Sequence, residues 1–268
     1  MEIVNNAYVT VSAAFYESGG VIMGTQRIPN NHLMEYWQDG NRNQTIAALI
    51  KPKKTYYLKD ALYVGRICTH FGHFLMEALP RLCDAIDDKF QIIGTLTEGF
   101  LPVGIKPARK EDIEWFIKTI TNKRFYKIDN QIYQVDRLYI PKLPLVLSQS
   151  CSEPWRMSAM IEKIVRQARL ENPHIINNIN TLYLKRNDEV VINTNPDIQS
   201  SNPDAPVSEQ IAKVSYAKKL VGKSGSNTHI SMFAKNDCYT EWIQRGDFQQ
   251  TDRNQLICDL VKTFNTFN

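Results

Sequence analysis

The feature that most constrains this chain is the alternation of short apolar runs with amphipathic segments in its C-terminal half. The runs with strand character are residues 181–184, 220–222 and 238–242, and the segments with helical spacing are residues 208–218, 229–234 and 255–264. Strands that alternate with helices of this length are typical of βαβ units, whose strands join one parallel sheet. We therefore predict an α/β fold for this half, with the polar residues 187–207 as a loop.

The N-terminal half is predicted to be rich in β-strands. Expected strands cover residues 3–4, 8–11, 21–23, 55–58, 61–64 and 90–94, and residues 131–140 are interpreted as a strand pair. Lys59-Asp60 is taken as a break, because two charged residues interrupt the apolar pattern. Lys110 opens a helix whose apolar residues have helical spacing, namely Ile113, Phe116, Ile117 and Ile120. Residues 141–154 are predicted to be a linker before a long helix from Pro154 to about Glu171.

The segment of residues 70–86 has two chemically different helical faces. Apolar side chains recur at three- and four-residue spacing on one face: Phe74, Leu75, Ala78, Leu79, Leu82 and Ile86. The other face carries His70, His73, Glu77, Arg81 and Asp84. Pro80 is expected to kink this helix, because proline lacks a backbone donor and clashes with the preceding turn. The polar face is either an ordinary solvated surface or part of a site that uses imidazole and carboxylate groups.

Composition argues against several broad classes of protein. The net charge of +4 is far from the strongly basic character of nucleic-acid-binding domains, so we expect no nucleic-acid partner. The five cysteines are scattered without a Cys-x-x-Cys pair, which argues against a disulfide framework or a zinc ribbon and suits a reducing cytosol. Residues 1–8 lack the features of a signal peptide, and no stretch approaches the roughly 18 apolar residues of a membrane-spanning helix. We expect a cytoplasmic protein.

A turn rich in small residues, 222–228 (Gly-Lys-Ser-Gly-Ser-Asn-Thr), joins a predicted strand to a predicted helix. Small side chains let backbone N–H groups approach an anion closely, and a helix N-terminus favours negative charge. Ligands of parallel sheets bind beyond the carboxyl ends of the strands, so a nucleotide diphosphate is the ligand to expect. A P-loop is excluded, because that motif requires glycine where this chain has Ala217. An ordinary helix cap is the alternative interpretation.

Basic residues occur in two further places. Arg186 follows a predicted strand and should emerge at the same sheet edge as the turn, where a guanidinium could bind a diphosphate through two hydrogen bonds. A second basic group surrounds the helix predicted from Lys110: Lys106, Arg109, Lys110, Lys118, Lys123, Arg124 and Lys127. It is either a solvated helix face or a contact surface for anionic lipid headgroups or an anionic glycan. No metal site is expected, since Cys68, His70 and His73 match no standard set of zinc ligands.

Four segments, taken together, resemble motifs of glycosyltransferase family 61 in that family's order. They are residues 71–82 (FGHFLMEALPRL), 182–186 (LYLKR), 208–211 (SEQI), and the turn with its helix over 221–233. The family has a His-Phe helix that ends in Leu-Pro-Arg-Leu, a Leu-Tyr-x-x-Arg strand, a Glu-Gln helix start and a Val-Gly-x-His-Gly-Ala turn. The similarity covers about residues 61–242. Ser224 stands where the family usually has histidine, and Ser226 stands where it usually has alanine.

This resemblance implies a GT-B-like α/β fold, in which two Rossmann-like domains face a cleft. The expected acceptor-side domain is residues 1–145, the expected nucleotide-sugar-binding domain is residues 155–250, and residues 251–268 are expected to form a C-terminal helix. The resemblance also implies an inverting, metal-independent glycosyltransferase that uses a nucleotide-sugar co-substrate and no other cofactor.

The residues expected in such a site fall into two groups. His73 is expected to be the general base, because an imidazole titrates near neutrality, and Glu77 either replaces or orients it. The donor-binding residues are Arg186, Lys185, Glu209, Lys223, Ser224, Gly225, Ser226 and Asn227. Arg186 and the turn amides would hold the leaving diphosphate, and Glu209 would accept hydrogen bonds from ribose hydroxyls.

The expected function is therefore transfer of a hexosyl or pentosyl group from a nucleotide sugar to a bacterial capsule, lipopolysaccharide or similar surface glycan. The acceptor is a glycan or a lipid-linked glycan, which the protein would meet at the inner face of the membrane through the basic region 106–127. The alternative is a catalytically degenerate partner protein that binds a nucleotide or a glycan without turnover. A metal-dependent hydrolase is a more distant alternative.

Overall fold

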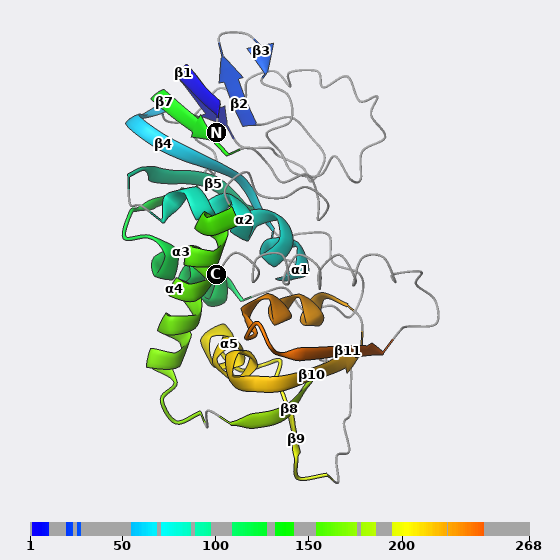
Figure 1. Ribbon diagram of the computed structural model, residues 1–268. Coiled ribbons are helices and arrows are strands. Elements are labelled where there is room, and N and C mark those ends of the chain that lie inside the picture. Colours follow the sequence, from blue (N-terminus) through cyan, green and yellow to red (C-terminus); the bar gives the residue numbers. More distant parts are fainter. Residues whose placement is uncertain are drawn as a thin grey trace.

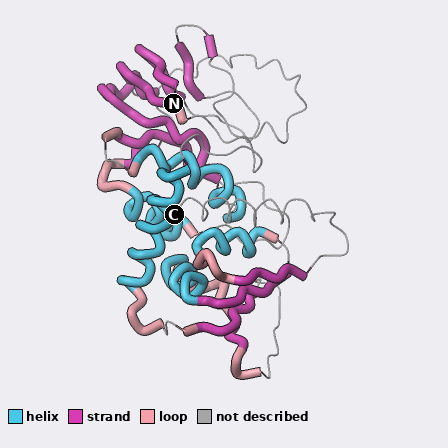
Figure 2. The backbone as a smooth tube through the Cα atoms, viewed as in Figure 1, coloured by secondary structure: helices cyan, strands magenta, loops and turns pink. Residues whose placement is uncertain are grey.

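The computed structural model describes residues 2–10, 20–23, 26–27, 55–68, 71–86, 89–97, 109–127, 132–141, 154–175, 178–185, 195–223 and 225–243. Figure 1 shows two β-sheets at opposite ends of this part of the molecule, with most helices between them. Figure 2 shows the same layers, with strands above and below a helical middle. The chain is therefore a mixed α/β protein, as its sequence predicts.

The first sheet has seven strands in the order β3-β2-β1-β7-β4-β5-β6. They are β1 (Glu2–Thr10), β2 (Gly20–Met23), β3 (Gln26–Arg27), β4 (Thr55–Cys68), β5 (Gln91–Thr97), β6 (Phe125–Lys127) and β7 (Ile132–Ile140). Strands β7, β4, β5 and β6 run parallel, whereas β1 is antiparallel to both β2 and β7. The N-terminal half is thus rich in strands, as predicted.

The second sheet is entirely parallel, with the order β11-β10-β8-β9. Its strands are β8 (Ile179–Leu184), β9 (Ile198–Ser200), β10 (Ala217–Lys223) and β11 (Tyr239–Ile243). The α-helix α5 (Val207–Tyr216) leads from β9 to β10, and the 3₁₀ helix η4 (Ser226–Phe233) leads from β10 to β11. The predicted alternation of strands and helices is present. Strand β9 is a correction, because it lies within the predicted loop 187–207.

In three neighbouring strands of the first sheet, the alternation of side chains between the two faces slips by one residue at the same level. In each strand, two residues on the face opposite the helices are three positions apart instead of two: Val4 and Ala7 in β1, Leu58 and Ala61 in β4, and Val135 and Leu138 in β7. Asn6 of β1, with φ of 52°, lies at this slip. The sequence pattern breaks at these points, so β1 and β4 were each predicted as two strands and β7 as a strand pair. All three are single strands.

An ion pair between neighbouring strands explains why charged residues remain inside them. Asp60 of β4 lies opposite Arg137 of β7, and the Arg137 guanidinium approaches the two carboxylate oxygens at 2.7 and 2.9 Å. The Tyr57 hydroxyl donates a hydrogen bond to Asp136, which raises the pKa of Tyr57. Because the Arg137 guanidinium offsets the charge of Asp60 across the strand pair, β4 and β7 continue through the charged positions.

One hydrophobic core connects the two sheets through the helical layer. It includes Leu62 of β4, Leu182 of β8 and Leu220 of β10, together with the buried faces of the helices between them. Near its centre, the ring of Phe116 lies 5.1 Å from the ring of Phe74 and 5.9 Å from that of Phe233. The described parts of the two halves are therefore packed together rather than separated.

Two helices of this layer match the sequence closely. Helix α3 (Lys110–Ile120) buries all four residues predicted for its apolar face, which are Ile113, Phe116, Ile117 and Ile120. Helix α4 (Pro154–Glu171) buries Met160, Ile164 and Ala168. The predicted boundary between domains at residues 145–155 falls mostly on residues outside those described, as does the helix predicted over 255–264.

The helix predicted over residues 70–86 forms as four consecutive short segments. They are α1 (Phe71–His73), η2 (Phe74–Ala78), α2 (Leu79–Arg81) and η3 (Leu82–Ala85). Segment η2 is a π-helical turn directly before α2, which contains Pro80, so the irregularity expected of proline is a widened helical turn. The predicted apolar face lies in the core or packs against it.

Arg81 corrects the predicted polar face of this helix. Its side chain is only 2% exposed, and its guanidinium donates a hydrogen bond to the carbonyl of Val64. That carbonyl lies at a β-bulge, where the register between β4 and β5 shifts and Gly65 adopts φ of 67°. A bulge disrupts the ladder of backbone hydrogen bonds, and Arg81 supplies a donor there. Arg81 is therefore a buried structural residue.

Candidate functional site

The carboxyl ends of β8 and β10 come together at one edge of the parallel sheet. Gly222 of β10 pairs with Leu184 of β8, and a Cβ atom at position 222 would lie 3.2 Å from both the Cβ and the carbonyl oxygen of Leu184. Glycine therefore permits this close approach of the two strands. Lys185 follows β8 and Lys223 ends β10, so the two lysines predicted for the donor site leave neighbouring strands at the same edge.

The turn after β10 is built around Gly225. This residue has φ of 156° and ψ of −172°, a conformation that residues with side chains rarely adopt. Its carbonyl accepts hydrogen bonds from both the backbone N–H of Thr228, at 3.0 Å, and the hydroxyl of Thr228, at 2.7 Å. These bonds start η4 at Ser226 rather than at His229, where the sequence predicted it. The first turn of η4 contains no acidic residue.

Asn227 connects this turn to the neighbouring strand. Its Nδ2 donates a hydrogen bond of 2.7 Å to the carbonyl of Leu184, which fixes the orientation of the amide. Its Oδ1 is buried and accepts no hydrogen bond from the described residues. A buried acceptor without a donor costs about 1–3 kcal/mol. The oxygen therefore marks a point where a donor group of a ligand would be stabilising.

The segment that carries His73 packs against η4. Both α1 and η2 contact η4, and Figure 1 shows α1 beside the helix that leads into β11. The Nδ1 atom of His229 in η4 lies 3.4 Å from the carbonyl oxygen of Gly72 in α1. The fold thus brings together two segments that the sequence separately indicated as functional.

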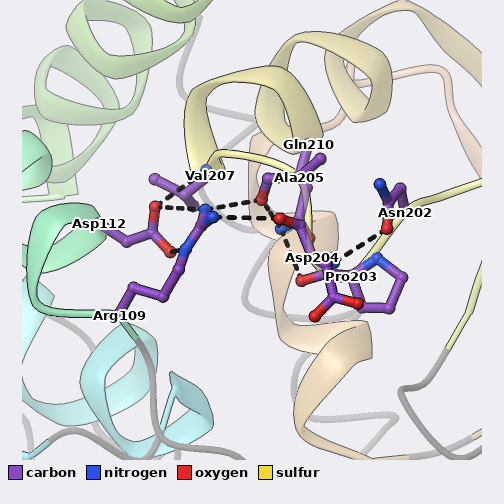
Figure 3. Close-up of polar contacts among 8 residues, drawn as sticks. All are labelled: Arg109, Asp112, Asn202, Pro203, Asp204, Ala205, Val207 and Gln210. Atoms are coloured by element: carbon purple, nitrogen blue, oxygen red, sulfur yellow. Dashed lines mark hydrogen bonds and ion pairs between the residues drawn. The ribbon is translucent and has the colours of Figure 1, made fainter.

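The N-terminus of α5 lies at the same edge of the sheet, because α5 runs from the end of β9 back to the start of β10. Pro206 precedes the helix and supplies no capping side chain. Instead, Oδ1 of Asp112 in α3 accepts a hydrogen bond of 3.1 Å from the Val207 N–H (Figure 3). A carboxylate therefore already occupies the position that would attract an anion. Glu209, in the first turn, forms an ion pair of 2.7 Å with Lys213.

Arg109 holds the Asp112 carboxylate in place. Its Nε and Nη2 atoms each donate a hydrogen bond of 2.9 Å to Asp112, one to each carboxylate oxygen. The same guanidinium donates to the carbonyls of Asp204, at 3.1 Å, and Ala205, at 2.8 Å (Figure 3). The hydrogen bonds to Asp112 raise the pKa of Arg109, so the guanidinium stays charged.

The predicted basic region 106–127 is thus partly neutralised within the protein. Arg109 is bound to Asp112, and Lys110 forms an ion pair of 3.5 Å with Glu114. The guanidinium of Arg124 lies 4.9 Å from the centre of the Tyr126 ring. The side chains of Lys118 and Lys127 are exposed, and Lys106 lies outside the described residues. Contact with an anionic surface stays a prediction.

Ser201 fixes the backbone at the end of β8. Its N–H donates a hydrogen bond of 2.8 Å to the carbonyl of Tyr183, and its hydroxyl accepts one of 2.9 Å from the N–H of Lys185. The side chain is nearly buried, with 8% of the residue exposed. Sequence reasoning missed this residue, because it follows a strand of three residues, β9, that was not predicted.

The other predicted site residues are placed to different degrees. His73 ends α1 and Glu77 lies in η2, so their backbones are beside η4, whereas the positions of their side chains lie outside the description. Also outside it are His70, Arg186, Ser224 and the side chain of Ser226. Among the described residues, no group of three or more histidine, cysteine, aspartate or glutamate side chains could hold a metal ion. None of the described helices is both long and apolar enough to cross a membrane.

Sequence reasoning also missed Asp112 and His229. The Arg-x-x-Asp spacing of Arg109 and Asp112 signals a helical ion pair, but not that Asp112 binds the N-terminus of a helix 95 residues away. His229 lay in a predicted helix with no indication that it faces Gly72. A comparison with models of protein families finds no match, and a comparison with curated proteins finds no significant match.

Proposed function

We propose that this protein is an inverting, metal-independent glycosyltransferase similar to family 61, which transfers a sugar from a nucleotide sugar to a glycan acceptor. In this proposal, the parallel sheet with α5 and η4 binds the donor, and the first sheet with α1 serves the acceptor, in a GT-B-like arrangement. The active site would lie where α1 meets η4, at the carboxyl edge of the parallel sheet.

The observation that carries the proposal is the packing of α1 against η4 at this edge. Nucleotides bind beyond the carboxyl ends of the strands in doubly wound sheets. A general base must lie within hydrogen-bond reach of the acceptor hydroxyl, next to the donor. His73 lies in α1 and Glu77 in η2, and both segments contact η4, which follows the turn around Gly225. This arrangement supports a general base next to a bound donor. The buried Oδ1 of Asn227 adds an acceptor for a donor group of the ligand.

The charges at this edge suggest how a nucleoside diphosphate would lie. The turn before η4 has Lys223 at its start and no acidic residue in its first helical turn, which suits the diphosphate. The N-terminus of α5 carries Glu209 and is bound by Asp112, which suits hydroxyl donors such as those of ribose. The two helix starts would therefore divide the recognition of phosphate and ribose between them.

In the proposed reaction, an acceptor hydroxyl attacks the anomeric carbon of the donor from the face opposite the nucleotide. The bond between this carbon and the phosphate oxygen breaks, and its electron pair leaves with the nucleoside diphosphate. His73 takes the hydroxyl proton, with Glu77 orienting it or acting in its place. The charge on the leaving diphosphate is stabilised by Lys185, Arg186, Lys223 and the turn residues Ser224, Gly225 and Ser226, whereas Oδ1 of Asn227 accepts a hydrogen bond from a donor group of the ligand.

A thermal-shift screen of the full chain against nucleoside diphosphates and nucleotide sugars tests donor binding. A ligand present at about 100 times its Kd should stabilise the folded state by about 2.7 kcal/mol. A binding donor is then used in a transfer assay with His73→Ala. We expect this variant to bind nucleotide normally and to lose transfer by about 100-fold or more, as for a missing general base.

The matched control is His174→Ala, because His174 is exposed and lies in the turn after α4 rather than in α1 or η4. It should keep wild-type binding and transfer. A screen without any nucleotide-dependent shift would contradict the proposal. Nucleotide binding without turnover of any donor would favour the alternative of a degenerate binding protein, and full transfer by His73→Ala would remove His73 from the role of base.

A further inference from the structure

We propose that Arg109 and Asp112 are positioning residues, which hold the loop of residues 201–206 from α3 and thereby fix the backbone at Lys185. The N-terminal half of the chain would in this way set the geometry of a strand end in the C-terminal half. The consequence for nucleotide affinity rests on the proposed function, whereas the consequence for the backbone at Lys185 does not.

The end of the loop next to α5 is attached to α3. Asp112 accepts a hydrogen bond from Val207, and Arg109 donates to the carbonyls of Asp204 and Ala205 (Figure 3). The Gln210 side chain of α5 also donates to the Ala205 carbonyl, at 2.8 Å. The loop carbonyls therefore point to side chains of two helices.

Hydrogen bonds within the loop make it rigid. The side chain of Asn202 accepts a hydrogen bond of 3.0 Å from the N–H of Asp204, and its backbone carbonyl accepts one of 3.1 Å from the N–H of Ala205. Pro203 restricts the backbone between them. A short loop with these internal bonds transmits a displacement at one end to the other.

The end of the loop next to β9 is attached to β8. Ser201 bonds the carbonyl of Tyr183 and the N–H of Lys185, so it holds both sides of Leu184. Asn227 binds the carbonyl of that same Leu184. The Arg109–Asp112 pair is thus connected through the loop to the strand end on which the turn of η4 rests.

The burial of Asp112 and the backbone contacts of both side chains distinguish the Arg109–Asp112 pair from an exposed surface ion pair. The Asp112 side chain is 15% exposed and that of Arg109 is 42% exposed. An exposed ion pair by itself contributes little to stability. Here, each partner also bonds backbone groups of another element, and α5 has no capping side chain of its own. Loss of Asp112 would leave both Arg109 and the Val207 N–H without this partner.

Hydrogen–deuterium exchange on the full chain tests this inference directly. We expect Asp112→Ala to speed exchange by about tenfold in residues 201–207 and also at Lys185, because local opening becomes easier. Asp112→Asn keeps an oxygen for Val207 but loses the charge that pairs with Arg109, so its exchange should be intermediate. The control is Glu114→Gln, whose carboxylate pairs with Lys110 on the same helix and should leave both regions unchanged.

Faster exchange at residues 205–207 with unchanged exchange at Lys185 would overturn the inference, because the displacement would then stop within the loop. If Asp112→Ala does not fold, Asp112→Asn and Arg109→Lys decide by the same criterion.

Isothermal titration with uridine diphosphate adds a measurement of ligand binding at the site, and we expect about fivefold weaker binding by Asp112→Ala. Equal affinity in the variant would contradict a role in the donor site. If the wild type binds none of the nucleoside diphosphates of the thermal-shift screen, the proposed function is contradicted, while exchange at Lys185 still decides the positioning role.

Discussion

The starts of α5 and η4 lie at the same edge of one parallel sheet, yet only the start of α5 carries acidic side chains. At α5, Asp112 already bonds the Val207 N–H, and Glu209 follows in the first turn. At η4, the first helical turn contains no acidic residue, and Lys223 ends the strand that leads into it. A helix N-terminus attracts an anionic ligand only where no protein carboxylate already occupies it.

Asn227→Asp should reduce this difference most strongly, because it places a carboxylate at the start of η4. The variant loses the hydrogen bond to the Leu184 carbonyl and repels a phosphate group. We expect the Kd for a nucleoside diphosphate to rise about 100-fold, or about 2.7 kcal/mol, in isothermal titration. The matched control is Asn202→Asp in the loop before α5, where the oxygen that accepts from Asp204 is retained. A similar loss in both variants would show that the charge acts without regard to position.

Gly225→Ala should have the next largest effect. The alanine must adopt a backbone conformation that costs about 1–3 kcal/mol, so the midpoint of thermal unfolding should fall by about 4 °C. Nucleotide affinity should fall about tenfold, because the turn amides move. Gly65→Ala is the matched control, since Gly65 also has positive φ but lies in the bulge of β4. It should lower the midpoint and leave nucleotide affinity unchanged, and equal affinity loss in both would contradict a phosphate site at Gly225.

Glu209→Gln should have the smallest effect and should distinguish the two helix starts by ligand. The amide still accepts a hydrogen bond from ribose but loses the charge, so the Kd for uridine diphosphate should rise about threefold. Binding of inorganic pyrophosphate, which has no ribose, should not change. Glu162→Gln, on the exposed face of α4, is the control. A change in pyrophosphate binding by Glu209→Gln would contradict the division of phosphate and ribose between η4 and α5.

The sequence predicted those features that depend on local pattern. The apolar faces of α3 and α4, and the alternation of β8, α5, β10 and η4, follow from spacing and turn residues that lie close together in the chain. The continuity of β4 and β7 could not be predicted in this way, because the Asp60–Arg137 pair that permits it joins residues 77 positions apart. The same limitation applies to Arg81, whose partner is the carbonyl of a bulge in another element.

The sequence predicted the segments that form the candidate site, but not the residues that hold these segments in place. The segment of His73 and the Gly225 turn were both recognised from composition and spacing, and the fold brings α1 to η4. Asp112 and Ser201 were missed, because each acts on backbone groups rather than through a motif. Backbone partners of this kind become visible only when the tertiary structure is known.

The proposed function requires that a nucleoside diphosphate binds at the turn of η4, beside α1. Hydrogen–deuterium exchange of the wild-type chain, measured with and without uridine diphosphate and the other common nucleoside diphosphates, tests it directly. We expect a binding nucleotide to protect residues 222–228 and residues 71–78 more than any other described segment. Protection confined to other segments, or none with any of these nucleotides, would contradict it.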